Sequence, residues 1–270
     1  MTKLSKTIEL SNGVEIPRVG FGVWKIDNEK VSGVVQTAIK AGYRHVDTAR
    51  AYKNEEGVGK GIKKSGLDRK KMFVTTKLAV QDFSRPEEEF ERSLEKLKMD
   101  YVDLYLLHWP FIGWKNAWKE LEKIYKEGKA RSIGVSNFNI KQLEEIKRMG
   151  GMKPMVNQVE ISPFINRKEL VAYCQTEGIV VEAYSPLTRG KRLGDKVIND
   201  LAKEYRKTAA QIMIRWGLQH DLVMLPKSET EEHIKSNIEV FDFEIKAADM
   251  KKLDSLNENY SALFPGWSRK

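Results

Sequence analysis

The sequence predicts an eight-fold β/α barrel, and three observations lead to that fold class. Eight short apolar segments alternate with amphipathic segments along the chain. Polar residues directly follow several of the apolar segments, as expected where buried parallel strands end at a common face. No G-x-G-x-x-G follows the first strand, although the rival fold, an open doubly wound sheet, usually carries one there. We predict a single barrel domain over residues 1–270.

The predicted strands are short apolar runs, and the predicted helices repeat apolar residues with a period near 3.6. Strands are predicted over residues 18–23, 43–47, 72–77, 102–107, 131–136, 155–160, 179–184 and 222–226. Helices are predicted over residues 29–42, 85–99, 116–129, 139–150, 167–178 and 208–219. Several helical segments end at a glycine, such as Gly128 or Gly150, which is the common C-terminal cap.

Two segments outside this alternation have their own interpretation. Residues 7–17 predict a two-stranded hairpin that turns at Asn12 and Gly13 and covers the bottom of the barrel. Three glycines at alternate positions lie within a helical stretch and follow no strand: Gly57, Gly59 and Gly61. We therefore interpret these glycines as close packing between helices and not as a dinucleotide-binding loop.

Composition narrows the class of protein. A single cysteine, Cys174, excludes a disulfide framework and fits a reducing compartment. The first residues lack the apolar core of a signal peptide, and no stretch approaches the about 18 apolar residues of a membrane span. The net charge of +9 is spread among acidic residues. This favours a solvated surface over a polyanion site and argues against nucleic acid. We expect a cytoplasmic protein without membrane contact.

The most informative residues are Asp47, Tyr52, Lys77 and His108. Asp47, Lys77 and His108 come at the ends of the second, third and fourth predicted strands, and Tyr52 follows Asp47 in a loop. The C-terminal strand ends of a β/α barrel line its active site, so these side chains are expected to meet. Each one alone also fits a helix cap, a surface ion pair or a core histidine. Together, at neighbouring strand ends, they indicate a proton-transfer site.

This set of residues suits carbonyl reduction. A tyrosine, with a pKa of about 10, is a weak acid at neutral pH, and a nearby ammonium is expected to lower that pKa. Lys77 can supply the ammonium, Asp47 can hold Lys77 in place, and His108 can orient a carbonyl oxygen. The sequence shows no activated serine or cysteine and no cluster with metal-ligand spacing, so no metal is expected. The hydride must come from elsewhere.

Longer motifs resemble the aldo-keto reductase family over nearly the full chain. They are GFGVWK, GYRHVDTARAYKNEEGVG, FVTTKL, DYVDLYLLHWP, GKARSIGVSNF, NQVEISPF, AYSPL and LPKS with the following HIKSN and VFDFE. The short loop after His108 resembles the corresponding loop in the compact microbial branch of the family. That branch includes prostaglandin F synthase and diketogluconate reductase-type members. The resemblance implies Tyr52 as general acid, tuned by Lys77 and Asp47, with His108 orienting the carbonyl.

The resemblance also implies a nicotinamide cofactor that lies extended across the barrel mouth. The positions implied for the cofactor are Gly22, Trp24, Asp47, Ser136, Asn137, Gln158, Tyr184, Ser185, Leu187, Lys227, Ser228, His233 and Asn237. The positions implied for substrate are Trp24, Tyr52, His108 and Trp109, with Phe111 and Trp267 as looser candidates. Tyr184 would stack on the nicotinamide. Arg189, Lys191 and Arg192 either add charge at the phosphates or are solvated loop residues.

The expected cofactor is NADP(H), with NAD(H) as a second possibility. Lys227 and Ser228 match the positions that grip the adenosine 2′-phosphate in the family. His233 stands where the family usually has arginine, and Ser236 stands where glutamate is common. A mostly neutral histidine lacks the fixed charge of arginine, so we expect weaker discrimination against NADH.

The leading hypothesis is an NAD(P)H-dependent reductase of aldehydes and ketones with a shallow, permissive pocket. Its partner would be a small aldehyde, ketone or alcohol, and the family resemblance favours a monomer. Three alternatives remain open. They are an alcohol dehydrogenase that works mainly in the oxidative direction, a non-catalytic cofactor-binding barrel subunit, and a phosphate-binding barrel isomerase or lyase.

Overall fold

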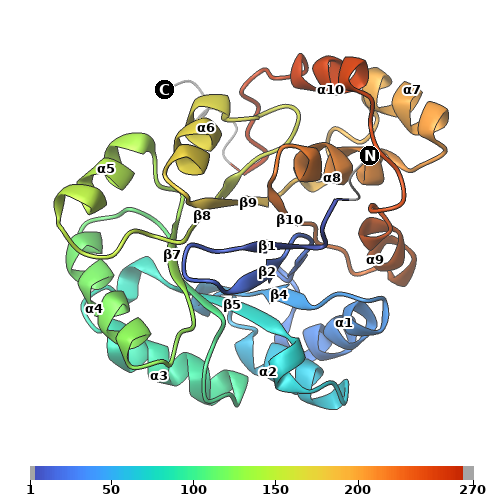
Figure 1. The fold of residues 1–270 in the computed structure, drawn as a ribbon. Helices are drawn as coiled ribbons and strands as arrows, with labels where there is room; N and C mark the ends of the chain where they lie inside the picture. The colour runs from blue at the N-terminus through green and yellow to red at the C-terminus, as the bar shows by residue number, and fades with distance from the viewer. Residues whose placement is uncertain (1–3, 264–270) are drawn as a thin grey trace.

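Eight parallel strands form a ring in the structure, a computed structural model that describes residues 4–263 (Figure 1). Each strand pairs with the next one along the chain. The strands are β3 (Phe21–Gly22), β4 (His45–Asp47), β5 (Phe73–Leu78), β6 (Leu104–Leu107), β7 (Ile133–Ser136), β8 (Val156–Glu160), β9 (Val180–Tyr184) and β10 (Val223–Leu225). The Gly20 amide donates to the Met224 carbonyl over 2.9 Å and closes the ring. The predicted barrel is confirmed, with most strands shorter than predicted.

Helices surround this ring (Figure 1). They are α1 (Asn28–Lys40), α2 (Glu55–Lys64), α3 (Pro86–Leu97), α4 (Trp114–Lys126), α5 (Ile140–Arg148), α6 (Lys168–Thr176), α7 (Lys196–Tyr205), α8 (Ala209–Gln219), α9 (Glu231–Ile238) and α10 (Ala247–Asp254). The helices predicted from the sequence do not include α7, α9 or α10. In α9 and α10 few residues are buried, so the apolar period that marks a helix is weak there. No helix within residues 4–263 has the length and apolar character to cross a membrane.

The hairpin covers the bottom of the barrel as predicted. Its strands are β1 (Thr7–Glu9) and β2 (Glu15–Pro17), and Gly13 adopts a φ of 82° in the turn between them. Leu10 and Ile16 are buried against residues at the N-terminal ends of the barrel strands. Figure 1 shows the two strands lying across the middle of the ring. This seal leaves the C-terminal end of the barrel as the open face.

The three alternating glycines allow helices to approach closely. A Cβ at Gly57 would lie 2.2 Å from the Asn28 carbonyl oxygen, and one at Gly59 would lie 2.1 Å from the Leu97 carbonyl oxygen. Both distances are far below van der Waals contact, so only glycine fits between α2 and its neighbours. The predicted helix packing is confirmed, and it brings α2 into close contact with α1 and with the end of α3.

Candidate active site

A cavity of about 990 Å³ opens at the C-terminal ends of the strands. This size is near the upper end of the range for small-molecule and cofactor sites. The residues predicted to bind cofactor or substrate that line it are Gly22, Trp24, Asp47, Tyr52, His108, Trp109, Ser136, Asn137, Gln158, Tyr184, Ser185, Leu187, Lys227, Ser228, His233 and Asn237. The fold therefore brings these predicted residues to one place.

Lys77 lies fully buried beneath this cavity. Its Nζ donates to Asp47 Oδ2 over 2.8 Å, to the Thr48 carbonyl over 2.8 Å and to the Tyr52 hydroxyl over 3.3 Å. Each of the three N–H groups of the ammonium therefore has a hydrogen-bond acceptor. Burial opposes the charged form, but Asp47 and Tyr52 outweigh it and raise the pKa of Lys77. A permanent positive charge therefore lies directly beside the Tyr52 hydroxyl.

The net pKa of Tyr52 differs in direction from the sequence-based expectation. Burial raises the pKa of Tyr52, and the nearby Lys77 ammonium only opposes part of that rise. Desolvation wins because the phenol lies in a low-dielectric pocket where a phenolate is poorly solvated. Tyr52 is consequently held as a neutral acid at physiological pH. The Lys77 ammonium therefore does not produce a phenolate in the resting site.

His108 faces Tyr52 across the catalytic end of the cavity. The two rings meet edge to face with centroids 5.6 Å apart. Burial and the Lys77 charge lower the pKa of His108 to about 3. The imidazole is therefore neutral at any physiological pH and can donate one N–H to a carbonyl oxygen. A cationic histidine there would be repelled by the Lys77 ammonium, so a neutral His108 is compatible with a charged Lys77.

The amides and hydroxyls predicted to hold a carboxamide form one connected group. Tyr184 donates its hydroxyl to Asn137 Oδ1 over 2.8 Å, and Asn137 Nδ2 donates to the His108 carbonyl over 3.1 Å. Ser136 Oγ donates to the Gln158 carbonyl over 2.9 Å. These bonds link residues at the ends of β6, β7, β8 and β9, so they connect Tyr184 and Asn137 to the backbone of His108.

Strained backbone occurs in the loops that line the cavity. Asn137, Ser185, Thr188 and Arg189 all have a positive φ between 50° and 66°. This region is tolerated by asparagine but costs energy for a β-branched residue such as Thr188. Strain of this kind tends to occur at binding sites, where the surrounding structure enforces it. Three of these four residues lie in the loop after β9, which forms part of the cavity wall.

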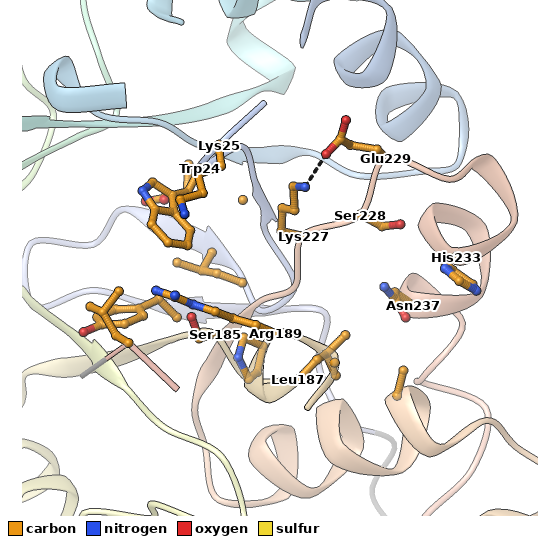
Figure 2. A pocket seen from close by; sticks show the side chains of 18 of the residues that line it. Trp24, Lys25, Ser185, Leu187, Arg189, Lys227, Ser228, Glu229, His233 and Asn237 are labelled. Carbon is orange, nitrogen blue, oxygen red and sulfur yellow. Dashed lines mark hydrogen bonds and ion pairs between the residues drawn. The ribbon is translucent and has the colours of Figure 1, made fainter. Parts of the chain in front are cut away.

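The far end of the cavity carries the residues predicted to contact phosphate. Lys227 and Ser228 line this end, and Figure 2 shows Lys227 directed toward Glu229, with His233 and Asn237 on the neighbouring helix α9. Lys227 forms an ion pair with Glu229, two residues along the chain. A second acid, Glu232, also lines this end. The positive charge available to a phosphate is therefore smaller than the lysine alone suggests.

The loop cations after β9 separate into two roles. Arg189 lines the cavity, and its guanidinium lies 4.2 Å from the centre of the Trp24 ring (Figure 2). Arg192 instead pairs with Glu258 over 2.5 Å and stacks 4.4 Å from the Phe164 ring. Arg192 therefore has partners of its own and does not line the cavity. Lys191 is exposed and does not line the cavity either.

The looser substrate candidates have different outcomes. Phe111 is 52% exposed, stands 6.3 Å from the Trp109 ring and does not line the cavity. Trp267 lies outside the described residues. Leu263, which the sequence analysis did not select, lines the cavity. Ser261 and Ala262, next to it, donate to the buried Glu160 carboxylate over 2.5 and 2.7 Å. The described end of the chain thus forms part of the pocket wall.

The donor set fits a nicotinamide dinucleotide. One end offers amides, a hydroxyl and an aromatic ring for a carboxamide-bearing ring, and the other offers a lysine and a serine for phosphate. The cavity runs between these ends, which suits an extended ligand. No group of three or more His, Cys, Asp or Glu residues within the described part of the chain is arranged to hold a metal ion.

Comparison with known proteins decides the family. Residues 18–258 match the aldo/keto reductase family. The chain belongs to this family. It is accordingly an oxidoreductase that acts on carbonyl groups, as the sequence-based hypothesis predicted.

Relatives of this aldo/keto reductase include proteins named for small dicarbonyl substrates. Glyoxal reductase of Bacillus subtilis is 48% identical over 262 residues, which cover 96% of this chain and 95% of that protein. Methylglyoxal reductase DkgA of Escherichia coli is 43% identical and covers 93% of each chain. The crystal structure of an aldo/keto reductase from Brucella melitensis superposes with a TM-score of 0.90 at 41% identity, covering 93% of this chain and 99% of that chain.

Sequence reasoning missed several residues of the reductase site. Lys25, Glu229, Glu232 and the first turn of α8, residues 208–210, line the cavity. These residues are exposed or lie on helix ends, and no strand pattern distinguishes them. Glu182 was also missed, although a signal existed. It is a charged residue inside an apolar strand and shares the strand face of Tyr184, two positions on.

Proposed function

We propose that this reductase converts aldehydes and ketones to alcohols with NADPH and that Tyr52 is the general acid. One observation carries the assignment: the Tyr52 hydroxyl accepts a 3.3 Å hydrogen bond from the buried Lys77 ammonium at the rim of the cavity. No other tyrosine has an ammonium within hydrogen-bond distance among the described residues. The polar group of Asn137 and Tyr184 beside it supports a carboxamide contact in the same cavity.

The proposed mechanism follows from the charges of these residues. A bound nicotinamide would supply the hydride to the carbonyl carbon. The neutral His108 donates its ring N–H to the carbonyl oxygen and fixes its position. As negative charge develops on that oxygen, Tyr52 transfers its hydroxyl proton to it. Lys77 then stabilises the phenolate, and Asp47 keeps Lys77 in place.

Small dicarbonyl aldehydes are the proposed substrate class. Two relatives are named for glyoxal and methylglyoxal. Trp24, Trp109 and Leu263 contribute apolar surface to the cavity wall. Such a wall accepts a small carbonyl compound and also tolerates larger aromatic aldehydes, which supports a permissive reductase.

The assay that tests this proposal follows nicotinamide absorbance with NADPH or NADH and a set of aldehydes. We expect turnover with methylglyoxal and with an activated aromatic aldehyde. The alternative, an alcohol dehydrogenase that works mainly in the oxidative direction, predicts faster turnover of alcohols with NAD⁺ at the same pH. Absence of turnover with either cofactor and every carbonyl compound would reject the proposal.

NADPH is the proposed cofactor, with NADH also accepted. Lys227 and Ser228 favour a 2′-phosphate, but Glu229 partly neutralises Lys227 and Glu232 adds negative charge nearby. His233 is exposed on α9 and supplies no fixed charge. These charges support a smaller preference for NADPH than a lysine and arginine pair would give.

Replacing His233 with arginine is expected to lower the Kd for NADPH by roughly 3–10-fold and to leave the Kd for NADH nearly unchanged. Glu231→Gln is the matched control, since it changes the net charge of α9 in the same direction at a residue that does not line the cavity. Fluorescence titration measures both constants. Equal tightening in the control, or none in His233→Arg, would contradict a contact between position 233 and the 2′-phosphate.

We further propose that the reductase acts as a monomer in the cytoplasm. The one cysteine, Cys174, is a buried free thiol, which supports a reducing compartment. Phe111 and Ile112 are the large apolar side chains exposed within residues 4–263, and they are neighbours in one loop. So small an apolar surface supports a monomer. Sedimentation at micromolar concentration tests it, with a dimer as the contradicting result.

A further inference from the structure

The hydrogen bonds of the catalytic group continue below it into the barrel. Gln158 lines the cavity and is 1% exposed. Its Nε2 donates to Asp47 Oδ1 over 2.8 Å and to Glu182 Oε2 over 2.8 Å. Tyr52, Lys77, Asp47, Gln158 and Glu182 therefore form one chain of contacts. The mechanism proposed above uses this chain only as far as Asp47.

The two carboxyl groups determine which way the Gln158 amide points. An amide has two hydrogens on nitrogen and only acceptor capacity on oxygen. The Asp47 carboxylate can only accept, so the reverse orientation would place the amide oxygen against it, and Glu182 Oε2 accepts the second Nε2 hydrogen. The oxygen is therefore directed away from them, and Gln158 lines the cavity. In this orientation it can accept a hydrogen bond from a bound carboxamide.

Glu182 is fully buried in the barrel interior. Its Oε1 has no hydrogen-bond partner within residues 4–263 and lies 3.7 Å from His45 Nε2. The other charged groups facing it are Asp47 from β4 and Lys77 from β5. The paired positions of β10 contribute Val223 and Leu225, which carry no charge. A carboxyl group with so little compensation is unusual in a barrel core.

The surroundings favour a proton on Glu182 at neutral pH. Burial and the Asp47 carboxylate raise the pKa of Glu182 to about 8, while burial lowers the pKa of His45 to about 3. Both side chains are then neutral, and the Lys77 and Asp47 pair leaves the site with no net charge. Loss of the Glu182 proton would add one negative charge, separated from Asp47 by a single amide.

We propose that Glu182 is a positioning residue of this reductase: it orients the Gln158 amide, and its proton sets the charge that Lys77 and Tyr52 experience. The proposal rests on the proposed role of Tyr52 as general acid. When Glu182 loses its proton, the added negative charge disfavours the Tyr52 phenolate. Tyr52 then stays protonated to higher pH, and reduction is sustained under alkaline conditions.

Two substitutions separate the charge of Glu182 from its hydrogen bond. Glu182→Gln keeps an acceptor for Gln158 but can never carry a charge, and Glu182→Met removes both. In Glu182→Gln we expect the alkaline limb of kcat/KM for reduction to move to lower pH by roughly 0.5–1 unit, with the Kd for NADP⁺ within about twofold of wild type. In Glu182→Met we expect that Kd to rise by roughly 3–10-fold, because Gln158 loses a partner.

Glu55→Gln is the matched control for a buried carboxyl group. Glu55 is 1% exposed and also has a raised pKa owing to burial, but it accepts from Thr76, whose side chain lies on the opposite face of β5 from Lys77. We expect the alkaline limb of kcat/KM for Glu55→Gln to coincide with that of wild type. An equal shift in Glu55→Gln, or no shift in Glu182→Gln, would refute the proposal for Glu182 and leave Tyr52 as the acid.

A spectroscopic measurement tests the proton on Glu182 without turnover. In protein labelled with ¹³C at the glutamate side-chain carboxyl, we expect one signal to titrate between about pH 7 and 9 and to disappear in Glu182→Gln. A carboxyl group at position 182 that titrates near the ordinary pKa of about 4.3 would overturn the proposal. If Tyr52→Phe retains wild-type activity, the assigned acid is wrong and the proposal for Glu182 falls with it.

Discussion

Replacing Tyr52 with phenylalanine is expected to lower kcat for aldehyde reduction by roughly 10²–10⁴-fold, the usual contribution of a positioned general acid. The substitution removes one oxygen and keeps the ring. The Lys77 ammonium lies 4.9 Å from the centre of that ring and keeps its bonds to Asp47 and Thr48. We therefore expect the fold and the Kd for NADPH to stay near wild type, as measured by thermal unfolding and fluorescence titration.

Tyr101→Phe is a suitable control for Tyr52→Phe. Tyr101 lies at the N-terminal end of β6, at the opposite end of the barrel, and its ring stacks 4.2 Å from the Arg69 guanidinium. Phenylalanine preserves that stack, so kcat should stay at the wild-type value. Wild-type kcat in Tyr52→Phe would refute the general-acid role, and a large loss in Tyr101→Phe would show that the assay responds to tyrosine replacement in general.

Replacing Lys77 with methionine is expected to abolish most activity and to lower the free energy of unfolding by about 3–5 kcal/mol. Lys77 is fully buried, and its ammonium is the charge that compensates Asp47. Methionine fills a similar volume, so the main loss is the buried Asp47 carboxylate left without its counter-ion. Urea unfolding monitored by circular dichroism measures the change.

The double variant Lys77→Met with Asp47→Asn separates stability from catalysis. Asparagine keeps an acceptor for the Gln158 amide and carries no charge. We expect the double variant to recover much of the stability lost by Lys77→Met while kcat remains low. A double variant no more stable than the single one would mean that the buried charge is not the cause of the loss.

Much of the barrel and its catalytic end could be predicted because strand ends carry strong local signals. Asp47 and Lys77 each follow an apolar run, and parallel strands of a barrel deliver such residues to one face. Neighbouring strands in sequence are neighbours in space here, so adjacency followed directly. Close helix packing could also be predicted from the alternating glycines between Gly57 and Gly61, since no larger residue fits where the helices touch.

The charged residues of the loops could not be predicted in the same way. Lys227 was expected at the phosphate, and Arg192 was left open between a phosphate contact and a solvated loop position. In the structure Lys227 pairs with Glu229 and Arg192 pairs with Glu258. A long flexible cation can reach many partners, and only the folded loop determines which one is near. The pKa of Tyr52 depends likewise on how much water the pocket excludes, which no local pattern reports.

The buried polar residues inside the barrel could be predicted only in part. His45 and Asp47 are two residues apart on β4, and Glu182 and Tyr184 are two residues apart on β9. The two side chains of each pair therefore point to the same, inward face. Only the member at the strand end was selected from the sequence, because catalytic residues are expected at the mouth. The deeper members, His45 and Glu182, are both polar and buried, and Glu182 extends the network through Gln158.

The central claim is that this site reduces a carbonyl group with Tyr52 as the proton donor. A single-turnover reaction with NADPH deuterated at the transferable position and an aromatic aldehyde tests it most directly. We predict that wild type places the deuterium on the carbinol carbon, and that Tyr52→Phe binds the cofactor equally well but transfers deuterium at least about a hundred times more slowly. Equal transfer rates in the two proteins, or no deuterium in the alcohol formed by wild type, would contradict the claim.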